Sequence, residues 1–242
     1  MIDPKILFFA IAYGLLPVIF WLWFWLKEDS VHPEPRGLIL LAFFGGMIST
    51  MAVLPLERYV NEIMGMSLER YININQINLT VTLTILFWVI IEEVVKFATA
   101  YFFVLNKKDY DEPIDAIIYL VTVALGFAAI ENIFFLIQPL ISGNIIGVIT
   151  TGNYRFMGPT ILHVVSSGII GFFLALSFYQ TKLVKFLYAG WGLILAIALH
   201  TSFNLFIIQG KNTYFIFSIV WVCVIFFIIF IEKIKKITKI KI

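Results

Sequence analysis

A small set of ionisable and polar side chains lies inside apolar stretches of this 242-residue sequence. The set consists of Glu92, Glu93, Lys96, Glu131, His163, His200 and Asn204. A charged side chain at the centre of a bilayer costs about 2.5–3.5 kcal/mol, so such residues normally face one another and serve a function. Carboxylates and imidazoles together can transfer protons, activate a water molecule or bind a metal ion.

The segment Glu92-Glu93-Val94-Val95-Lys96 places two carboxylates and one ammonium group in a single apolar stretch. Glu92 and Lys96 are four residues apart, which puts them on one helical face in the order that favours an ion pair. Glu93 lies about 100° around the helix and has no such local partner. We therefore expect Lys96 to pair with Glu92. Because one lysine cannot balance two carboxylates, a general base is the functional interpretation, and a structural ion pair is the alternative.

The other polar residues lie in three further apolar stretches. Glu131 follows Gly126, whose small size suits close helix packing, although a lone glutamate can also serve as a packing hydrogen bond. His163 begins another stretch, and its imidazole could act as an acid–base group or a ligand. His200 and Asn204 are four residues apart and therefore share one helical face. Two histidines and several carboxylates on different helices indicate a common cluster.

The expected depths of these residues agree with a common cluster. With a rise of about 1.5 Å per residue, Glu131 and His163 lie about 9 Å from the outer ends of their helices. His200 lies about 12 Å from its outer end, and Glu92 and Glu93 lie about 20 Å in, near the midplane. Antiparallel helices would bring all five into a layer between the midplane and the outer surface.

The overall composition excludes a soluble protein. Hydrophobic residues make up 61% and charged residues 13% of the chain, and the mean hydropathy is +0.98. Soluble domains are about 45–50% apolar and about 25% charged. The net charge of +2 gives no basic surface for a polyanion, so we expect no nucleic-acid partner. The single cysteine, Cys223, excludes a disulfide framework and a cysteine metal cluster.

We predict an all-α, polytopic membrane bundle of about seven transmembrane helices, forming one membrane domain over residues 1–242 with a catalytic core at 79–208. Each crossing needs about 20 apolar residues. The expected spans are Ile6–Leu26, Gly37–Leu56, Leu79–Leu105, Ile114–Leu136, Met157–Phe178, Phe186–Ile208 and Tyr214–Ile231. Two long outer connections join them. Glu57–Gln76 is expected to be a loop or a short interfacial helix, and Gln138–Phe156 a loop that dips into the interface.

Four of these segments together resemble the PrsW family of intramembrane proteases, within the wider CAAX-protease and bacteriocin-processing (CPBP) superfamily. They are Glu-Glu-x-x-Lys at 92–96, Gly-Phe-x-x-x-Glu-Asn at 126–132, His163 with its small-residue tract, and His-x-x-x-Asn at 200–204. The family's Asp-Gly-x-x-Tyr-Gly stretch would fall at 115–120, where both glycines are absent. The resemblance implies an integral protein of the bacterial cytoplasmic membrane that cleaves a single-span membrane protein. By family analogy, that substrate is an anti-sigma factor cut on its extracytoplasmic side.

Two hydrolytic schemes fit these residues. In the glutamate scheme, Glu92, alone or together with Glu93, is the base, and a histidine helps to orient the water. Lys96 orients the carboxylates, and His200 with Asn204 stabilises the oxyanion. No cofactor is then needed. In the metal scheme, Glu131, His163 and His200 hold a zinc ion with one open position. We favour the glutamate scheme, because the sequence lacks the His-Glu-x-x-His pattern of many zinc proteases.

Two other functions use similar residues. A proton- or ion-coupled transporter also places acidic and histidine side chains at the midplane. Its usual inverted repeats and paired broken helices are not evident in this sequence. A non-catalytic membrane immunity or scaffold protein is the third interpretation.

The lysine-rich tail should lie in the cytoplasm and the N-terminus outside. With seven spans, eleven of the 17 Lys and Arg residues fall on the side of the C-terminal tail, and positive loops stay in the cytoplasm. A reporter fused after Ile242 should be active only if it is a type that works in the cytoplasm. An active periplasmic reporter at that position would contradict the orientation or the odd number of spans.

Overall fold

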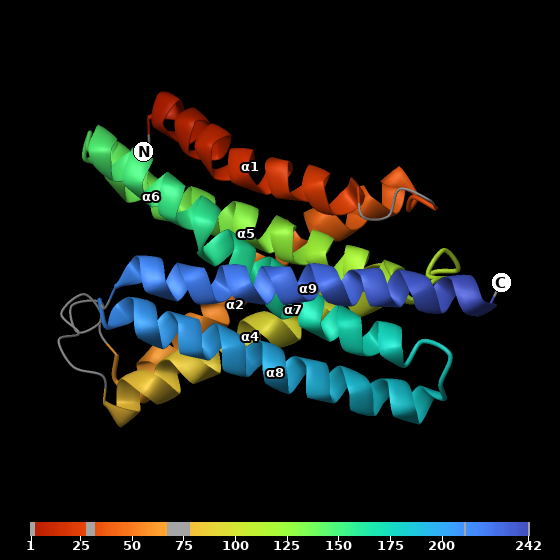
Figure 1. Ribbon diagram of the computed structural model, residues 1–242. Coiled ribbons are helices and arrows are strands. Elements are labelled where there is room, and N and C mark those ends of the chain that lie inside the picture. Colours follow the sequence, from red (N-terminus) through yellow and green to blue (C-terminus); the bar gives the residue numbers. More distant parts are fainter. Residues whose placement is uncertain (1–2, 28–31, 67–77, 211, 242) are drawn as a thin grey trace.

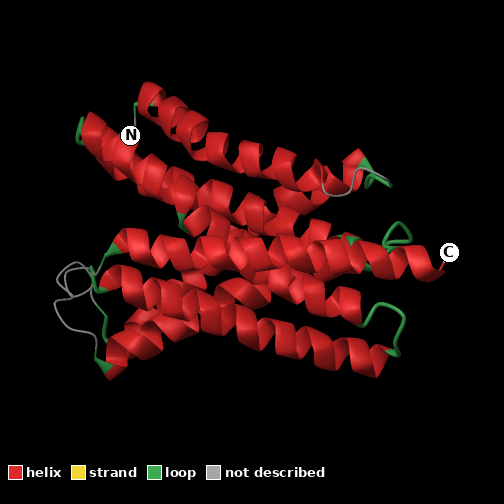
Figure 2. Cartoon of the chain, in the orientation of Figure 1, coloured by secondary structure: helices red, strands yellow, loops and turns green. Residues whose placement is uncertain are grey.

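The computed structural model describes residues 3–27, 32–66, 78–210 and 212–241, and these residues form helices joined by short connections (Figure 1, Figure 2). The helices are α1 (Pro4–Leu26), α2 (Arg36–Met64), α4 (Leu79–Phe103), α5 (Asp115–Ile141), α6 (Ile145–Met157), α7 (Pro159–Leu176), α8 (Lys182–Ile208) and α9 (Thr213–Lys241). The described part of the chain contains no strand. The prediction of an all-α polytopic membrane bundle is therefore confirmed.

Six helical stretches are long and apolar enough to cross a membrane. One of them, Ile145–Leu176, comprises α6 and α7 together. The helix α4 has 25 residues but carries Glu92, Glu93 and Lys96, so it falls outside this set by its charge. The predicted total of seven spans depends on counting α4, and the orientation of the two termini remains a prediction.

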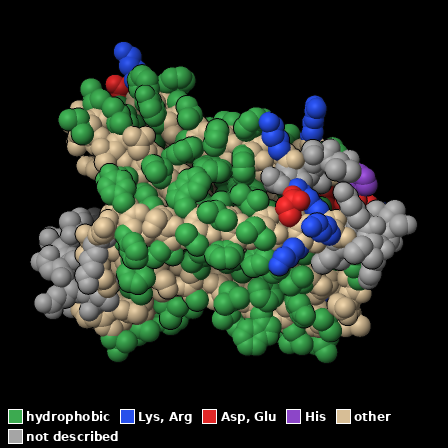
Figure 3. All heavy atoms as spheres, viewed as in Figure 1, with side chains coloured by type: hydrophobic (Ala, Val, Ile, Leu, Met, Phe, Trp, Pro, Cys, Tyr) green, Lys and Arg blue, Asp and Glu red, His purple; other side chains and the backbone are tan. Residues whose placement is uncertain are grey.

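Helix α5 lies at the centre of the bundle, packed against α1, α2 and α7. About 72% of its most apolar window is buried, against 28% for α1 and for α8. In a bilayer, the backbone N–H and C=O groups must bond to each other because no water reaches them. The long apolar segments of this chain are therefore helical. The outer helices present apolar side chains outward, as the green surface of Figure 3 shows. Helix α5 is thus the scaffold against which the other helices position their polar residues.

Two glycines allow α2 and α5 to meet backbone to backbone. A Cβ atom added at Gly46 would collide with the carbonyl oxygen of Val123, and one added at Gly126 would collide with that of Phe43. Small residues at such crossings are typical of membrane helix pairs. Just beyond this crossing, Thr50 Oγ1 donates a hydrogen bond to the carbonyl of Phe127. The close approach brings the C-terminal half of α2 next to the polar residues of α5.

Neither predicted outer connection is a loop at its described residues, so the loop prediction for Gln138–Phe156 is wrong. Helix α2 continues past Leu56 to Met64, where Gly65 ends it in the left-handed conformation, and residues 67–77 lie outside the described part. Residues 145–157 form α6 rather than a loop, with the Asn144 side chain accepting a hydrogen bond from the Gly147 N–H. The helix is interrupted at Gly158 and Pro159, between α6 and α7, because proline has no N–H to continue the helical hydrogen bonds.

A second group of acidic side chains lies at the N-terminal end of α5. Tyr119 donates a hydrogen bond to the carboxylate of Glu34, in the connection between α1 and α2. Asp115 Oδ2 accepts the backbone N–H groups of Asp111 at 3.0 Å and Glu112 at 2.7 Å, so it caps the turn that precedes α5. Burial raises the pKa of the Glu34 carboxyl above its usual range. These contacts hold the α1–α2 connection on the start of α5.

Candidate active site

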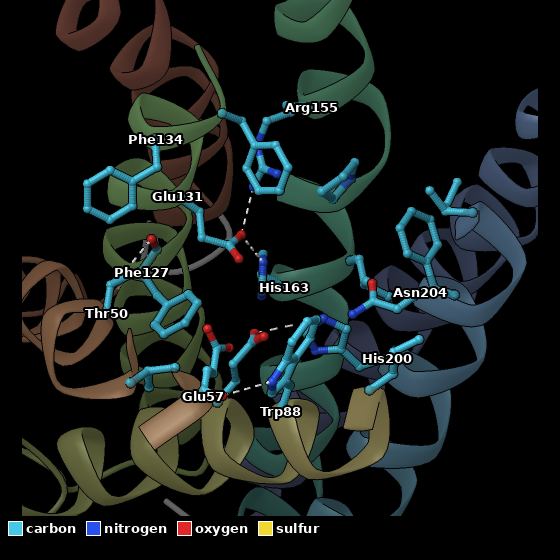
Figure 4. Close-up of a pocket in the computed structure, with 18 of the residues that line it drawn as sticks. Thr50, Glu57, Trp88, Phe127, Glu131, Phe134, Arg155, His163, His200 and Asn204 are labelled. Carbon is cyan, nitrogen blue, oxygen red and sulfur yellow. Dashed lines mark hydrogen bonds and ion pairs between the residues drawn. The ribbon is translucent and has the colours of Figure 1, made fainter. Parts of the chain in front are cut away.

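A cavity of about 340 Å³ opens inside the bundle, between α2, α4, α5, α6, α7 and α8 (Figure 4). Most of its lining is apolar. The ionisable and amide side chains that line it are Glu57, Glu92, Glu131, Arg155, His163, His200 and Asn204. Five residues of the predicted cluster therefore share one cavity, and the remaining two, Glu93 and Lys96, lie behind it.

Glu93 is completely buried behind the cavity, where it contacts polar side chains of α4, α7 and α8. Its Oε1 atom lies 2.6 Å from Lys96 Nζ and 2.8 Å from His200 Nδ1. The hydroxyl groups of Ser166 and Ser167, on α7, donate to its two oxygens at 3.0 and 3.4 Å. The predicted Glu92–Lys96 pair is therefore wrong. Lysine pairs instead with the carboxylate three residues earlier, because α7 and α8 supply the donors that a buried carboxylate needs on the Glu93 side.

Glu92 faces the cavity and is the less satisfied of the two carboxylates. Its side chain is 8% exposed, and its Oε2 atom has no hydrogen-bond partner among the described residues. The nearest group that can carry a positive charge is His200, whose Nε2 atom lies 3.9 Å from that oxygen. Because an unpaired carboxylate oxygen in a buried site is costly, this oxygen is the feature of the site that needs a functional explanation.

Hydrogen-bond partners assign the proton on each imidazole. A carboxylate only accepts, so His200 Nδ1 carries the proton toward Glu93, which leaves Nε2 on the side of Glu92. His163 has the opposite arrangement. Its Nδ1 atom lies 3.0 Å from Lys96 Nζ and accepts, so its Nε2–H donates to Glu131 at 2.8 Å. Both ring nitrogens of His163 are thus engaged by the protein.

Glu131 is held by a residue that the sequence analysis missed. Arg155 Nη2, from α6, lies 2.7 Å from the Glu131 carboxylate, and Arg155 Nε donates to the side-chain oxygen of Asn132. The Arg155 side chain is 7% exposed. It was overlooked because it lies in a polar stretch interpreted as a loop. The only sequence signal was a basic residue just before an apolar span that contains a histidine.

Glu57 is the second missed residue. It lies on the part of α2 for which a loop or a short interfacial helix was predicted, and it lines the same cavity as Glu92. The indole N–H of Trp88, one turn before Glu92, donates to the backbone carbonyl of Glu57 at 3.3 Å. Asn204 lines the cavity from α8, one turn after His200, as predicted from their spacing.

A set of side chains that could hold a metal ion is also present, with one change from the predicted ligands. One donor atom each from Glu92, His163 and His200 lies within 4.8 Å of the others. The predicted set contained Glu131 in place of Glu92. Two histidines and one glutamate are a donor set typical of catalytic zinc. The residue types and their proximity thus fit a zinc ion.

The fold and this site define a polytopic membrane protein with a buried acid–base cluster beside an internal cavity. The model of the PrsW family, described as an intramembrane metalloprotease family, matches residues 34–231. The chain belongs to this family. It is an integral membrane protein and an intramembrane protease.

Curated relatives agree with the family match. The protein named Protease PrsW from Geobacillus kaustophilus (strain HTA426) is 27% identical over 180 residues, which cover 73% of this chain and 70% of the relative. Protease PrsW from Bacillus subtilis (strain 168) is 23% identical over 206 residues, covering 85% and 86%. No solved structure matches the chain. The predicted family, protease function and membrane localisation are confirmed, and the bacterial relatives support the cytoplasmic membrane. The superfamily and the anti-sigma factor substrate remain predictions.

The Lys96→Met substitution should destabilise the protein strongly, because it leaves the Glu93 carboxylate buried without its cation. Breaking one partner of a buried ion pair costs about 3–5 kcal/mol. Thermal unfolding in detergent should show a much lower midpoint. The double variant Lys96→Met/Glu93→Gln, which removes both charges, should recover a large part of the loss.

The exposed pair of Arg58 and Glu62, four residues apart on α2, provides the matched control. Its two side chains are 83% and 64% exposed, so Arg58→Met should change the midpoint little. Equal midpoints for Lys96→Met and Arg58→Met would contradict the assignment of Glu93 and Lys96 as the structural pair.

Proposed function

We propose that Glu92 is the general base of a metal-independent hydrolysis, which cleaves a peptide bond of a single-span membrane protein within the bilayer. The observation that carries this proposal is the unpaired Glu92 oxygen facing the cavity, beside a Glu93 that is fully occupied. The two adjacent carboxylates then have separate roles. Glu93 orients His200 through a 2.8 Å contact, and Glu92 reacts.

The reaction begins with a water molecule in the cavity. Glu92 removes a proton from this water as its oxygen bonds to the scissile carbonyl carbon. The Asn204 amide lies on the same face of α8 as His200 and donates to the developing oxyanion. His200 Nε2, 3.9 Å from Glu92, accepts a hydrogen bond that orients the water. Each step uses a group that lines the cavity.

The position of Glu92 supports a membrane-embedded substrate. It lies close to the middle of the 25-residue helix α4, and the cavity wall around it is mostly apolar. A scissile bond must therefore enter the hydrocarbon layer to reach it, which a single-span substrate can do and a soluble one cannot. Family membership favours proteolysis over the transporter and scaffold interpretations. An anti-sigma factor is the substrate that the family analogy suggests.

A zinc-dependent reaction is the second candidate, and the close set of Glu92, His163 and His200 favours it. A zinc ion bound there would polarise the scissile carbonyl and activate water. Against it, His163 Nδ1 lies 3.0 Å from the buried Lys96 ammonium group. A zinc ion at Nε2 would have to displace Glu131 and leave the ring without either proton. This contact is our reason for preferring the metal-independent scheme.

The Glu92→Gln substitution should abolish cleavage while the fold survives, because Gln keeps the shape of Glu but cannot take up a proton. We expect a loss of at least about 100-fold. The measurement uses purified full-length protein in liposomes and a panel of single-span peptides that carry a fluorophore and a quencher. Glu62→Gln, at an exposed position on α2, is the control and should retain full activity. Cleavage of no peptide by the unaltered protein, or undiminished cleavage by Glu92→Gln, would refute the proposal.

Strong chelators should leave the cleavage rate unchanged, and purified protein should contain no stoichiometric zinc. Metal analysis and an activity measurement after treatment with 1,10-phenanthroline check this. Activity that disappears with the chelator and returns with zinc would assign Glu92, His163 and His200 as ligands instead.

A further inference from the structure

We propose that Arg155 binds the substrate directly, by donating a hydrogen bond to a backbone carbonyl that flanks the scissile bond. This inference rests on the proposed function, in which a membrane-spanning peptide enters the cavity. In a helix each carbonyl group bonds to the N–H group four residues later, so the peptide must unwind locally to present a bond for attack. A carbonyl freed in this way has no water to bond to in the hydrocarbon layer. The cavity must therefore supply donors for the substrate backbone.

The side chains that line the cavity include few hydrogen-bond donors, and most of these are already used. The donors that bond to acceptors of the protein itself belong to Thr50, Trp88, His163 and His200. The amide of Asn204 is assigned to the oxyanion in the proposed reaction. The remaining donor among the lining side chains is the guanidinium group of Arg155. Arg155 is therefore the lining residue that can bond to a second carbonyl of the substrate.

Two of the three guanidinium nitrogens of Arg155 are held by the protein. Nε donates to the side-chain oxygen of Asn132, and Nη2 donates to the Glu131 carboxylate at 2.7 Å. The ring of Phe135 covers one face of the group, with its centroid 4.3 Å from the guanidinium carbon. A guanidinium group is planar and rigid, so these contacts also fix the direction of the third nitrogen, Nη1.

The Nη1 group has no hydrogen-bond partner among the described residues, and it remains accessible. It is not one of the side-chain atoms that are both unpartnered and fully enclosed. Because Arg155 lines the cavity and its side chain is 7% exposed, we infer that this accessible group faces the cavity. Figure 4 shows Arg155 reaching from α6 toward the cavity beside Glu131. Arg155 thus presents a spare donor whose position is fixed before the substrate binds, which lowers the entropic cost of binding.

The charges around Arg155 favour a neutral acceptor over an acidic side chain of the substrate. Glu131 already pairs with its positive charge, and Glu57 and Glu92 line the same cavity. A further carboxylate would be placed beside groups of like charge, which is unfavourable, whereas a backbone carbonyl has no net charge. Because every residue has a backbone carbonyl, Arg155 can hold substrates of different sequence in the same register.

The location of Arg155 indicates which substrate segment it contacts. Glu92 lies close to the middle of α4, whereas Arg155 lies on α6, which precedes the N-terminal end of α7. The bound carbonyl therefore belongs to the segment between the scissile bond and the end of the bundle at which α7 begins.

Weakening single carbonyl groups of the substrate tests this contact. The peptide that the unaltered protein cleaves is made as a series of esters, each of which replaces one amide that flanks the scissile bond. An ester carbonyl is a weaker acceptor than an amide carbonyl, and the side chains stay the same. We expect the ester at one position, on the side named above, to raise KM by about 10-fold. The value of kcat should stay within about threefold, because the contact is made in the bound substrate and in the transition state alike.

The Arg155→Lys variant identifies the donor. Lysine keeps a cation for Glu131, but its single ammonium group lacks the second arm that reaches the substrate. This variant should raise KM for the amide peptide by about 10-fold and keep kcat within about threefold. The ester that affects the unaltered protein should then change KM by less than about threefold, because the contact is already lost. Arg58→Lys is the matched control, since Arg58 is 83% exposed, and it should respond to every ester as the unaltered protein does.

The outcomes separate this inference from the proposed function. Equal responses of the unaltered protein and Arg155→Lys to every ester would overturn the role of Arg155 in binding. A fall in kcat at unchanged KM would overturn it too, because Arg155 would then only support Glu131. In both cases the role of Glu92 stands if cleavage is lost in Glu92→Gln, and activity in that variant would refute the base instead. If Arg155→Lys fails to fold, Arg155→Gln replaces it, with peptide dissociation constants in liposomes as the measurement, and equal losses of affinity for every ester again overturn the proposal.

Discussion

The ion pair between Glu93 and Lys96 is the interaction on which the rest of the site depends. Both side chains are completely buried and their charged atoms lie 2.6 Å apart. A buried pair is tolerable only when additional hydrogen bonds satisfy the remaining atoms. Ser166, His200 and His163 provide them, from two other helices. The cost of leaving these charges unsatisfied is therefore what fixes α4, α7 and α8 relative to one another.

That requirement gives two adjacent, chemically identical residues different roles. Because successive residues of a helix point about 100° apart, Glu93 faces the helices that supply donors while Glu92 faces the cavity. The satisfied carboxylate sets the tautomer and orientation of His200, and through Lys96 those of His163. The other carboxylate keeps a free acceptor oxygen facing the cavity, as the proposed base requires. A buried ion pair and the proposed base are thus contributed by one short segment of α4.

Part of the cavity wall comes from segments that were not predicted as membrane spans. The C-terminal end of α2 brings Glu57, and α6 brings Arg155, which contacts Glu131 at 2.7 Å. With these two residues, the cavity gains an arginine that holds Glu131 in place and a further carboxyl group. The match to the PrsW family extends over both segments, so the whole site lies within the matched region.

The sequence by itself determined the all-α membrane class, the family and five of the polar residues at the cavity. Apolar length and the energetic cost of buried charge are local properties, so they identify Glu92, Glu131, His163 and His200 without knowledge of contacts. Spacing also placed Asn204 on the face of His200. The packing of several helices was needed for the rest. It decided that Lys96 pairs with Glu93 rather than Glu92, and that Glu57 and Arg155 belong to the site. Ion-pair choice among residues three and four apart depends on which neighbouring helix supplies the other donors, and no local pattern in the chain encodes that neighbour.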